Sequence, residues 1–507
     1  MTMKNENKGS QLLLLGGVLI LALIFRIINL GGESLWFDEA LSYLAASLSP
    51  LQIWSNAIQS SHPPLYYFFL HYWQQVVPDQ DTFLRTLGVF WDIALILATY
   101  ALSLALFRKR NLALFTALLI AISPFHVLYS QELRMYTQLM LFVVLGTLGY
   151  WQGKQTGRRI WWLLFGASFV LALYTHYFAV WTLGAIGFHA LLHYREKAVL
   201  QKTVLVSTIV GALMVPWVWI VWRNIDPKLG ALRPLTQTYS LDPLKPLTTL
   251  VFLIFGKSNY LWYTGFAMFA IVALGAVLLL DWRRIRQEGT TDNLVLVLLI
   301  IVTGLAGPLL IYFVHPYFLT ERTMAATSPF LFIILGWGLS KRQSPLPYLV
   351  GFTTVILVIG TILYPFQPAN KPPYRDVVNW IAQNRQANDV ILHTSDGSYW
   401  PALRYVNWPY HVVLAGDPDP RRSTTVHRLV GGDVWTQEQV LEHHGRLWLV
   451  VALEHSVEWQ VAQSDYFSKR YHLLDKQEIG GVQVYLYDPI ANVRSNLWST
   501  CQLSYLC

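Results

Sequence analysis

A series of long apolar runs constrains the fold of this chain more than any other feature. Each run has about 17 to 23 residues, which is enough to cross a bilayer as an α-helix. Only 13% of the 507 residues are charged, whereas a soluble domain has about 25% charged residues. The pattern predicts a polytopic α-helical membrane protein with about eleven transmembrane helices. The runs begin near Gln11, Phe83, Asn111, Glu132, Ile160, Tyr177, Thr203, Leu261, Asn293, Thr323 and Leu346.

The basic residues lie in alternate loops between these runs. The net charge of +8 is therefore not gathered on one face of a soluble domain, and we expect no nucleic-acid partner. By the positive-inside rule, the basic loops and the N-terminus are cytoplasmic. The first run leads into a carboxylate pair without a small-residue cleavage site, so it is interpreted as a retained anchor. The basic loops are residues 107–111, 153–159, 194–202, 281–287 and 341–343.

The opposite loops then share the outer face, and histidine, tyrosine, arginine and carboxylates recur in them. Tyr and Trp favour membrane interfaces in general, but that preference does not explain the ionisable groups. Two amphipathic pieces of the first outer loop, residues 40–48 and 65–77, are predicted to be helices lying on the membrane. The outer loops contain WFDEALSY, SHPPLYYFFLHYW, SPFHVLYSQELRMY, LYTHYF, the stretch 223–260 and HPYFLTERT.

The chain changes character after residue 364. Residues 365–374 form a proline-rich linker, and the residues beyond it are more polar. A helix-like segment at 375–385 and strand-like runs at 389–394, 446–453 and 482–488 alternate there. This pattern predicts a soluble α/β domain on the outer side. The expected domains are therefore 1–364 in the membrane and 375–507 outside it.

Two cysteines, Cys501 and Cys507, lie close to the end of the sequence. They exclude a disulfide scaffold and a cysteine metal site of the usual spacing. Whether the two thiols pair with each other stays open.

Five motifs in order resemble one family. They are WFDEA after the first run, HPPLYY closing the same loop, SQELRMY, THY, and ERT before a run ending SPFLFIILGWGL. Together with the topology they resemble the dolichyl-phosphate-mannose/protein mannosyltransferase-like family of GT-C glycosyltransferases, in particular its bacterial members. The resemblance implies transfer of a hexose or pentose from a polyprenyl-phosphate donor to a lipid, glycan or protein acceptor. It also implies a multi-pass protein of the bacterial plasma membrane, embedded in the lipid bilayer, with an extracytoplasmic active site and an acceptor in the cell envelope.

Such a reaction would explain why two carboxylates are adjacent in the WFDEA motif. An acceptor hydroxyl must lose its proton to a base, and the resemblance implies Asp38 as this base. Glu39 is implied as a supporting carboxylate that orients the acceptor or a metal. The alternative is that Asp38 caps a helix that begins at Ala40.

The leaving phosphate needs cations or hydrogen-bond donors at the membrane surface. Arginine suits this role because its planar fork donates two parallel bonds. The candidates by position are Arg134, Tyr136, Arg322 and His62. The two arginines alternatively snorkel to the interface or pair with a local acid, Glu132 or Glu321. His62 stands where relatives of the family have lysine, so it alternatively orients Asp38 or binds a metal.

Three further residues carry weaker signals. His176 and Tyr177 either line the cavity or are ordinary interfacial residues. Asp92 lies within an apolar run, seven residues after Arg85 and on nearly the same helical face, so the two are predicted to pair.

No cofactor is required by the sequence. A divalent cation held by Asp38, Glu39 and His62 stays an open alternative, because no spacing dictates it. A transporter or flippase of a lipid-linked substrate is the competing function, although such folds show repeated halves and broken helices near the midplane. A sensor or scaffold is disfavoured, since so many runs exceed what an anchor needs.

Overall fold

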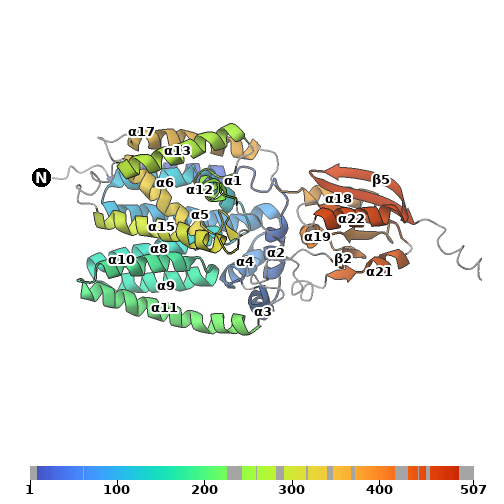
Figure 1. Cartoon of the computed structure of the whole chain (residues 1–507), viewed down its shortest axis with the longest axis horizontal. Helices are drawn as coiled ribbons and strands as arrows, with labels where there is room; N and C mark the ends of the chain where they lie inside the picture. Colours follow the sequence, from blue (N-terminus) through green and yellow to red (C-terminus); the bar gives the residue numbers. More distant parts are fainter. Residues whose placement is uncertain are drawn as a thin grey trace, which may run out of the picture. The chain divides into compact units, whose positions relative to one another are not determined.

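The computed structural model describes residues 8–60, 62–224, 242–257, 260–280, 291–315, 318–339, 346–366, 371–416, 432–443, 445–452 and 457–489. The chain divides into two compact units (Figure 1). The first, here called the helical unit, comprises Met1–Gly31 and Ala57–Pro368. The second, here called the sheet unit, comprises Gly32–Asn56 and Ala369–Cys507.

The helical unit contains a helix at each of the predicted apolar runs. Their bounds are α1 Lys8–Ile27, α5 Asp81–Phe107, α6 Arg110–Ala121, α8 Tyr136–Thr156, α9 Arg159–Thr175, α10 Ala179–Leu192, α11 Lys197–Asn224, α13 Leu261–Leu280, α15 Thr291–Tyr312, α16 Ser328–Leu339 and α17 Leu346–Leu363. The unit also contains α4 Leu65–Val76, α7 Pro124–Ser130, α12 Lys245–Phe255 and the short 3₁₀ helices η2 Ala325–Thr327 and η3 Tyr364–Phe366.

Length and apolarity identify the candidate membrane spans among these helices. Within the described ranges, five helices are long and apolar enough to cross a membrane, or six if α6 and α7 form one bent span. Five shorter apolar helices accompany them in the described ranges, namely α9, α10, α12, α13 and α16. The protein is therefore a multi-pass membrane protein, and the number of about eleven spans stays a prediction.

The break between α6 and α7 has a local cause. The two helices meet at a bend of 60°. Ser123 is the N-cap of α7 and its side chain accepts a hydrogen bond from the amide of His126, while Pro124 occupies the first turn. In the first turn of a helix the backbone amides have no partner within the helix, so proline, which has no amide hydrogen, is tolerated there. The serine side chain accepts a hydrogen bond from another of these amides. The sequence therefore restarts the helix in a new direction, and the turn after α7 carries the SQELRMY motif to the start of α8.

The predicted pairing of Asp92 with Arg85 is wrong. The Arg26 Nε atom of α1 donates to Asp92 Oδ2 at 2.6 Å, and both side chains are fully buried. His126 Nδ1 lies 3.2 Å from the other oxygen of Asp92, and its Nε2 lies 3.1 Å from Ser328 Oγ. Arg85 instead donates to the carbonyl of Leu30 at 3.0 Å. A buried charge needs a partner wherever the fold supplies one, and here the partner comes from another helix.

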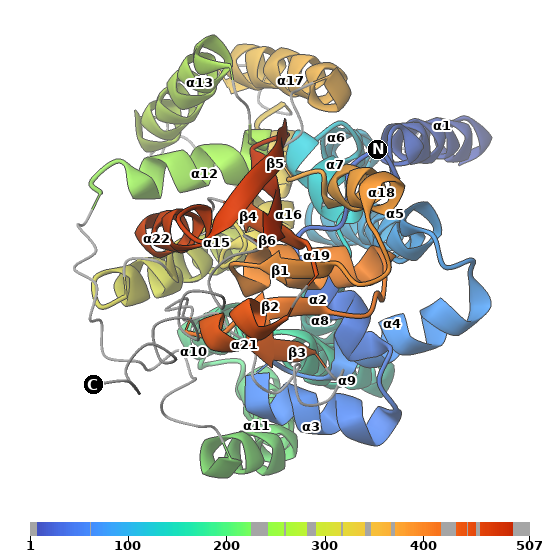
Figure 2. The ribbon, with the colours of Figure 1, turned by 90° about the vertical axis from the view of Figure 1, so that its right-hand side faces the viewer.

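The sheet unit contains a six-stranded sheet with the order β3-β2-β1-β4-β6-β5, and its strands are labelled in Figure 2. Its strands are β1 Val390–His393, β2 His411–Leu414, β3 Asp433–Trp435, β4 Leu447–Ala452, β5 Tyr471–Ile479 and β6 Val482–Pro489. The first four strands in this order, β3, β2, β1 and β4, pair in parallel, and β6 and β5 extend the sheet beyond β4 in antiparallel orientation. Its helices are α18 Tyr374–Asn384, α19 Asp396–Tyr405, α21 Gln437–Glu442 and α22 Val457–Ser468.

This sheet confirms the predicted C-terminal α/β domain, whose central strands are buried on both faces. β1, β2 and β4 are buried at every position, as expected for strands covered on both faces. The predicted helix at 375–385 and the three predicted strands are α18, β1, β4 and β6.

Helix α2, in the loop between α1 and α5, packs on this sheet domain. The loop includes α2 Phe37–Ala46 and α3 Pro50–Ser60, and α3 continues into the helical unit. Phe37, Ala40 and Leu44 of α2 form one core cluster with Tyr399 and Trp400 of α19. The sequence analysis placed these loop residues in a membrane domain ending at residue 364, whereas their apolar face belongs to the core of the sheet unit. The predicted helical character of residues 40–48 and 65–77 is present in α2 and α4.

Some predictions lie outside the described residues. They are the basic loops 281–287 and 341–343, half of the stretch 223–260, part of the linker 365–374, and the pairing of Cys501 and Cys507.

Candidate functional site

The carboxylate pair occupies the first turn of α2. This helix begins at Phe37, and its N-cap is Trp36, which makes no side-chain capping bond. Asp38 is therefore inside the helix, and the alternative that it caps a helix beginning at Ala40 is wrong. The N-terminal end of a helix carries partial positive charge and stabilises acids in its first turn. Asp38 is partly exposed, whereas Glu39 is buried.

Glu39 has a lysine partner from the other end of the chain. Lys371 Nζ lies 3.0 Å from Glu39 Oε2 and 3.8 Å from Glu33 Oε2. The Lys371 side chain is 8% exposed and that of Glu39 is 0% exposed, so water screens this pair little. Two backbone bonds accompany the pair: Leu35 donates to the Tyr405 hydroxyl at 2.7 Å, and Arg375 donates to Ser34 Oγ at 3.1 Å. The sheet unit thus holds the two residues Ser34 and Leu35 that lie just before the helix carrying the carboxylate pair.

Replacing Lys371 with methionine should loosen this loop. The change leaves the buried Glu39 carboxylate without its ammonium partner, and a hydrogen bond to a charged group contributes about 1.5 to 3 kcal/mol. We expect faster hydrogen–deuterium exchange in the peptide covering residues 33–46, and little change for Lys371→Arg. Lys476→Met, at an exposed position of β5, is the matched control. Unchanged exchange in Lys371→Met would show that the pair does not hold the loop.

Arg134, Tyr136 and His176 gather at one end of the α8–α9 hairpin. Arg134 and Tyr136 stand at the start of α8, and His176 directly follows α9. Because these neighbouring helices run antiparallel, the beginning of one and the end of the other meet (Figure 1). The Arg134 guanidinium carbon lies 5.9 Å from the centre of the Tyr136 ring, and the Tyr136 and His176 ring centres are 6.4 Å apart.

His176 is held in its neutral form. Burial lowers its pKa to about 3, and the electrostatic influence of His62 and Arg134 acts in the same direction. These charge effects place His62 and Arg134 near the same imidazole. The Phe178 amide donates to His176 Nδ1 at 3.3 Å, so in the neutral ring the hydrogen is on Nε2. His176 therefore offers a neutral N–H donor beside a permanent arginine charge.

Tyr177 has a hydrogen-bond partner on another helix. Its hydroxyl accepts a hydrogen bond from Trp217 Nε1 of α11 at 2.9 Å. Two residues adjacent in the sequence thus contact different helices: His176 contacts Tyr136 of α8, and Tyr177 contacts α11. A cavity-lining role for either residue stays a prediction.

Arg322 belongs to a neighbouring charged group that includes Glu321, Lys257 and Tyr129. Lys257 Nζ lies 2.7 Å from Glu321 Oε1, and the Tyr129 hydroxyl donates to the same oxygen at 3.2 Å. Burial raises the pKa of Glu321, but the charge and hydrogen bond of Lys257 outweigh it, and the Arg322 charge adds to them, so the net pKa is lowered. Glu321 is thus an ionised carboxylate whose closest cation is Lys257.

The two groups are continuous through aromatic contacts. The Tyr129 and Tyr136 ring centres are 5.1 Å apart in an edge-to-face arrangement. Arg134, Arg322 and Lys257 supply positive charge along this path, and Glu132 and Glu321 supply negative charge. The arrangement can bind a phosphate through arginine forks and neutral donors.

Sequence reasoning missed Lys257, Tyr129 and Lys371. Lys257 lies at the end of the long stretch 223–260, in which no motif singles it out. Lys371 stands in the proline-rich linker, 332 residues from its partner. Only the tertiary contacts identify these residues.

Comparison with known proteins supports the fold. Residues 61–222 match the family described as dolichyl-phosphate-mannose-protein mannosyltransferase. The crystal structure of ArnT from Cupriavidus metallidurans bound to undecaprenyl phosphate aligns with a TM-score of 0.60 and 11% identity, covering 95% of this chain and 98% of that chain. The apo structure of the same protein gives a TM-score of 0.61 and 11% identity, covering 94% and 98% of the two chains. A search of curated protein sequences found no match.

These findings confirm two predictions. The chain has the GT-C fold, with a helical membrane part followed by a sheet domain. The predicted resemblance to the mannosyltransferase-like family is confirmed over residues 61–222, which include His62, Arg134, Tyr136, His176 and Tyr177.

Proposed function

We propose that this protein is a membrane glycosyltransferase that moves a hexose or pentose from a polyprenyl-phosphate donor to an acceptor in the cell envelope. The observation that carries the proposal is the group at the end of the α8–α9 hairpin. It combines the charge of Arg134, the neutral N–H of His176 and the phenol of Tyr136. Such donors suit a phosphate monoester or diester at the end of an apolar chain.

The comparisons support this assignment. ArnT, which shares the fold, is described in complex with undecaprenyl phosphate. The matched family is described as transferring mannose from a dolichyl phosphate to protein. Both descriptions name a polyprenyl phosphate, which is the lipid part of the donor that we propose for this protein.

The proposed chemistry needs one base and one anion site. The acceptor hydroxyl attacks the anomeric carbon of the sugar while Asp38 takes its proton. The bond between the anomeric carbon and the phosphate oxygen breaks, and the polyprenyl phosphate leaves with both bonding electrons. Arg134, Arg322 and the neighbouring donors stabilise this charge. Glu39, held by Lys371, fixes the direction of the first turn that carries Asp38.

We assign the protein to the bacterial plasma membrane, with the active site and the sheet unit on the extracytoplasmic face. The support is the alternation of basic loops, of which residues 107–111, 153–159 and 194–202 are the cytoplasmic set expected from the positive-inside rule.

Mass spectrometry of envelope glycolipids, glycans and glycoproteins tests the function. Cells lacking the gene should lose one sugar modification, and the wild-type gene should restore it. Identical envelopes in both strains would overturn the proposal. If purified protein in vesicles moved a polyprenyl-phosphate sugar across the bilayer without transferring it, the flippase alternative would replace it.

Donor binding should depend chiefly on Arg134 and Arg322. Alanine at either position should weaken polyprenyl-phosphate binding by roughly 10- to 100-fold, because an arginine bonded to a charged group contributes about 1.5 to 3 kcal/mol. Lysine should cause a smaller loss, since it keeps the charge but not the fork. Titration of the four purified variants with polyprenyl phosphate measures both effects. If all four bind like wild type, the phosphate site must be reassigned, with His62 and Tyr136 the next residues to test.

A further inference from the structure

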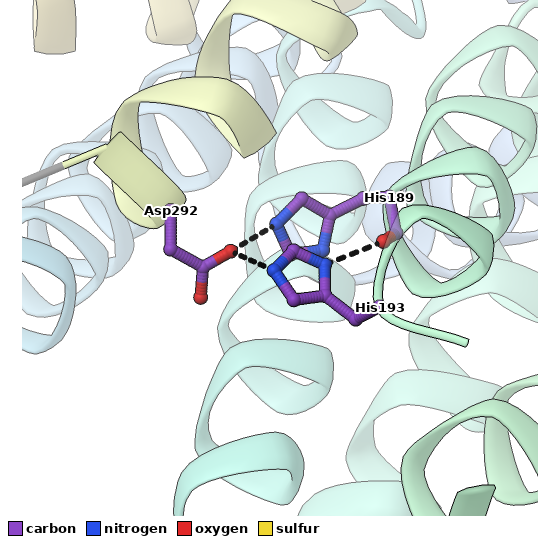
Figure 3. A group of neighbouring side chains, drawn as sticks. All are labelled: His189, His193 and Asp292. Carbon is purple, nitrogen blue, oxygen red and sulfur yellow. Dashed lines mark hydrogen bonds and ion pairs between the residues drawn. The ribbon is translucent and has the colours of Figure 1, made fainter. Parts of the chain in front are cut away.

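A second group of chemically capable side chains lies at the far end of α8. His189 lies in the last turn of α10, His193 is the C-cap residue that follows this helix, and Asp292 lies in the first turn of the facing helix α15 (Figure 3). Lys154, near the end of α8, contacts the same carboxylate. Tyr136 and Lys154 are 18 residues apart on α8, and a rise of 1.5 Å per residue separates them by about 27 Å. This group is therefore separate from the proposed phosphate-binding residues Arg134, Tyr136 and His176.

The two imidazoles converge on a single oxygen atom. His189 Nε2 lies 2.9 Å and His193 Nε2 lies 2.8 Å from Asp292 Oδ1. Among the described residues, this is the group whose His and acidic ligand atoms lie close enough to share a metal ion, all within 4.8 Å of one another. Histidines four residues apart on a helix project from the same face, which is a common arrangement for metal ligands.

The hydrogen bond of the His193 ring leaves its Nε2 atom for a cation. His193 Nδ1 lies 2.9 Å from the His189 carbonyl oxygen, which only accepts, so this nitrogen carries the hydrogen. In the neutral ring the Nε2 lone pair then faces the Asp292 carboxylate. Two lone pairs at 2.8 Å repel, so a positive centre, either a proton or a metal ion, must lie between them.

The surrounding residues resemble the outer shell of a metal site. The Tyr150 hydroxyl lies 2.8 Å from His189 Nδ1 and fixes the orientation of that ring. Lys154 Nζ lies 3.1 Å from Asp292 Oδ2, so it holds the oxygen that the histidines do not face. Ligating histidines and carboxylates are typically held in this way by second partners. His189 is buried, while the side chains of His193 and Asp292 are 27% and 34% exposed, which gives an ion access from solvent.

We propose that His189, His193 and Asp292 bind one divalent transition-metal ion of the Zn²⁺ type and thereby join α10 to α15. Zinc prefers imidazole nitrogen and carboxylate oxygen in a tetrahedron, with bonds of about 2.0 to 2.2 Å. Ligand atoms in such a tetrahedron are about 3.3 Å apart, so each contact lengthens by about half an ångström. Water fills the fourth position. The ion replaces the proton between the rings and the carboxylate, and it acts as a structural tie rather than in sugar transfer.

Metal titration of the full-length protein in detergent tests the proposal. The protein carries no polyhistidine tag and is treated with a chelator before Zn²⁺ is added. We expect one Zn²⁺ per chain by calorimetry and a rise of several degrees in the unfolding temperature. His193→Ala, at the more exposed position, should abolish both effects. Tyr150→Phe keeps the shape but removes the outer-shell partner, so it should weaken binding about 10- to 100-fold.

His472→Ala, at an exposed position of β5, is the matched control and should bind Zn²⁺ like wild type. Cobalt substitution gives a second readout, because a tetrahedral site produces a visible absorption band that His193→Ala should lose. Wild-type protein that binds no Zn²⁺, or His193→Ala that binds it unchanged, would overturn the proposal and leave a proton-bridged ion pair.

Discussion

Asp38→Asn is expected to lower sugar transfer by about 10²- to 10⁴-fold, the usual loss when a general base is removed. The amide keeps the shape of the side chain but cannot take the acceptor proton. Asp38 is partly exposed in the first turn of α2, so the substitution buries no new polar group. The protein should stay folded and bind polyprenyl phosphate nearly as well as wild type. Single-turnover transfer with purified protein and a separate binding titration distinguish the two steps.

Asp376→Asn is the control for the loss of a carboxylate at a helix start. Asp376 also lies in the first turn of a helix, α18, in the same sheet unit, and it is exposed. The helix dipole alone accounts for only about 0.3 to 1 kcal/mol at such positions. Asp376→Asn should therefore leave transfer unchanged. If Asp38→Asn keeps more than half of the wild-type turnover, Asp38 is not the base.

Asp92→Asn should destabilise the helical unit by about 3 to 5 kcal/mol, because removing one member of a buried ion pair leaves the other charge uncompensated. Arg26 and Asp92 are both fully buried, and Arg26 also donates to the Ala121 carbonyl at 2.9 Å. His126 loses its carboxylate partner as well. The free energy of unfolding in detergent, compared with that of wild type, measures the loss.

The double variant Arg26→Met with Asp92→Leu provides the matched comparison. Replacing both members of a buried pair by apolar residues of similar size is often neutral or stabilising. The double variant should therefore be more stable than Asp92→Asn alone. If it is equally unstable, the defect comes from packing among the helices and not from the unpaired charge.

The case of Asp92 shows where sequence reasoning reaches its limit. Hydropathy identified the helices, because a long apolar run in a bilayer has to satisfy its own backbone hydrogen bonds. The same reasoning indicated that Asp92 needs a partner. It selected Arg85 from the same helix, since periodicity describes only neighbours along one helix. The actual partner, Arg26, is 66 residues away, and only helix packing brings it close.

The residues of the candidate site also fall into two classes: some were identified from sequence motifs, and others were identified only by tertiary contacts. Arg134, Tyr136 and His176 were identified because they belong to motifs at helix ends, and the fold of the α8–α9 hairpin brings these ends together. Lys257 and Lys371 are isolated lysines in irregular segments. These lysines matter because they contact the buried carboxylates of Glu321 and Glu39. A local sequence pattern contains no information about such long-range contacts.

The position of α2 in the core of the sheet unit has a consequence for the order of events during synthesis. Residues 32–56 leave the ribosome roughly 300 residues before the strands and helices they pack against. At about 5 to 20 residues per second, this interval is about 15 to 60 s. Throughout it the apolar side chains of Phe37 and Leu44 lack Trp400, and Glu39 lacks Lys371. The proposed catalytic turn therefore acquires its native surroundings only after Lys371 and Trp400 have been synthesised, so a chain truncated before them cannot form the surroundings of the proposed base.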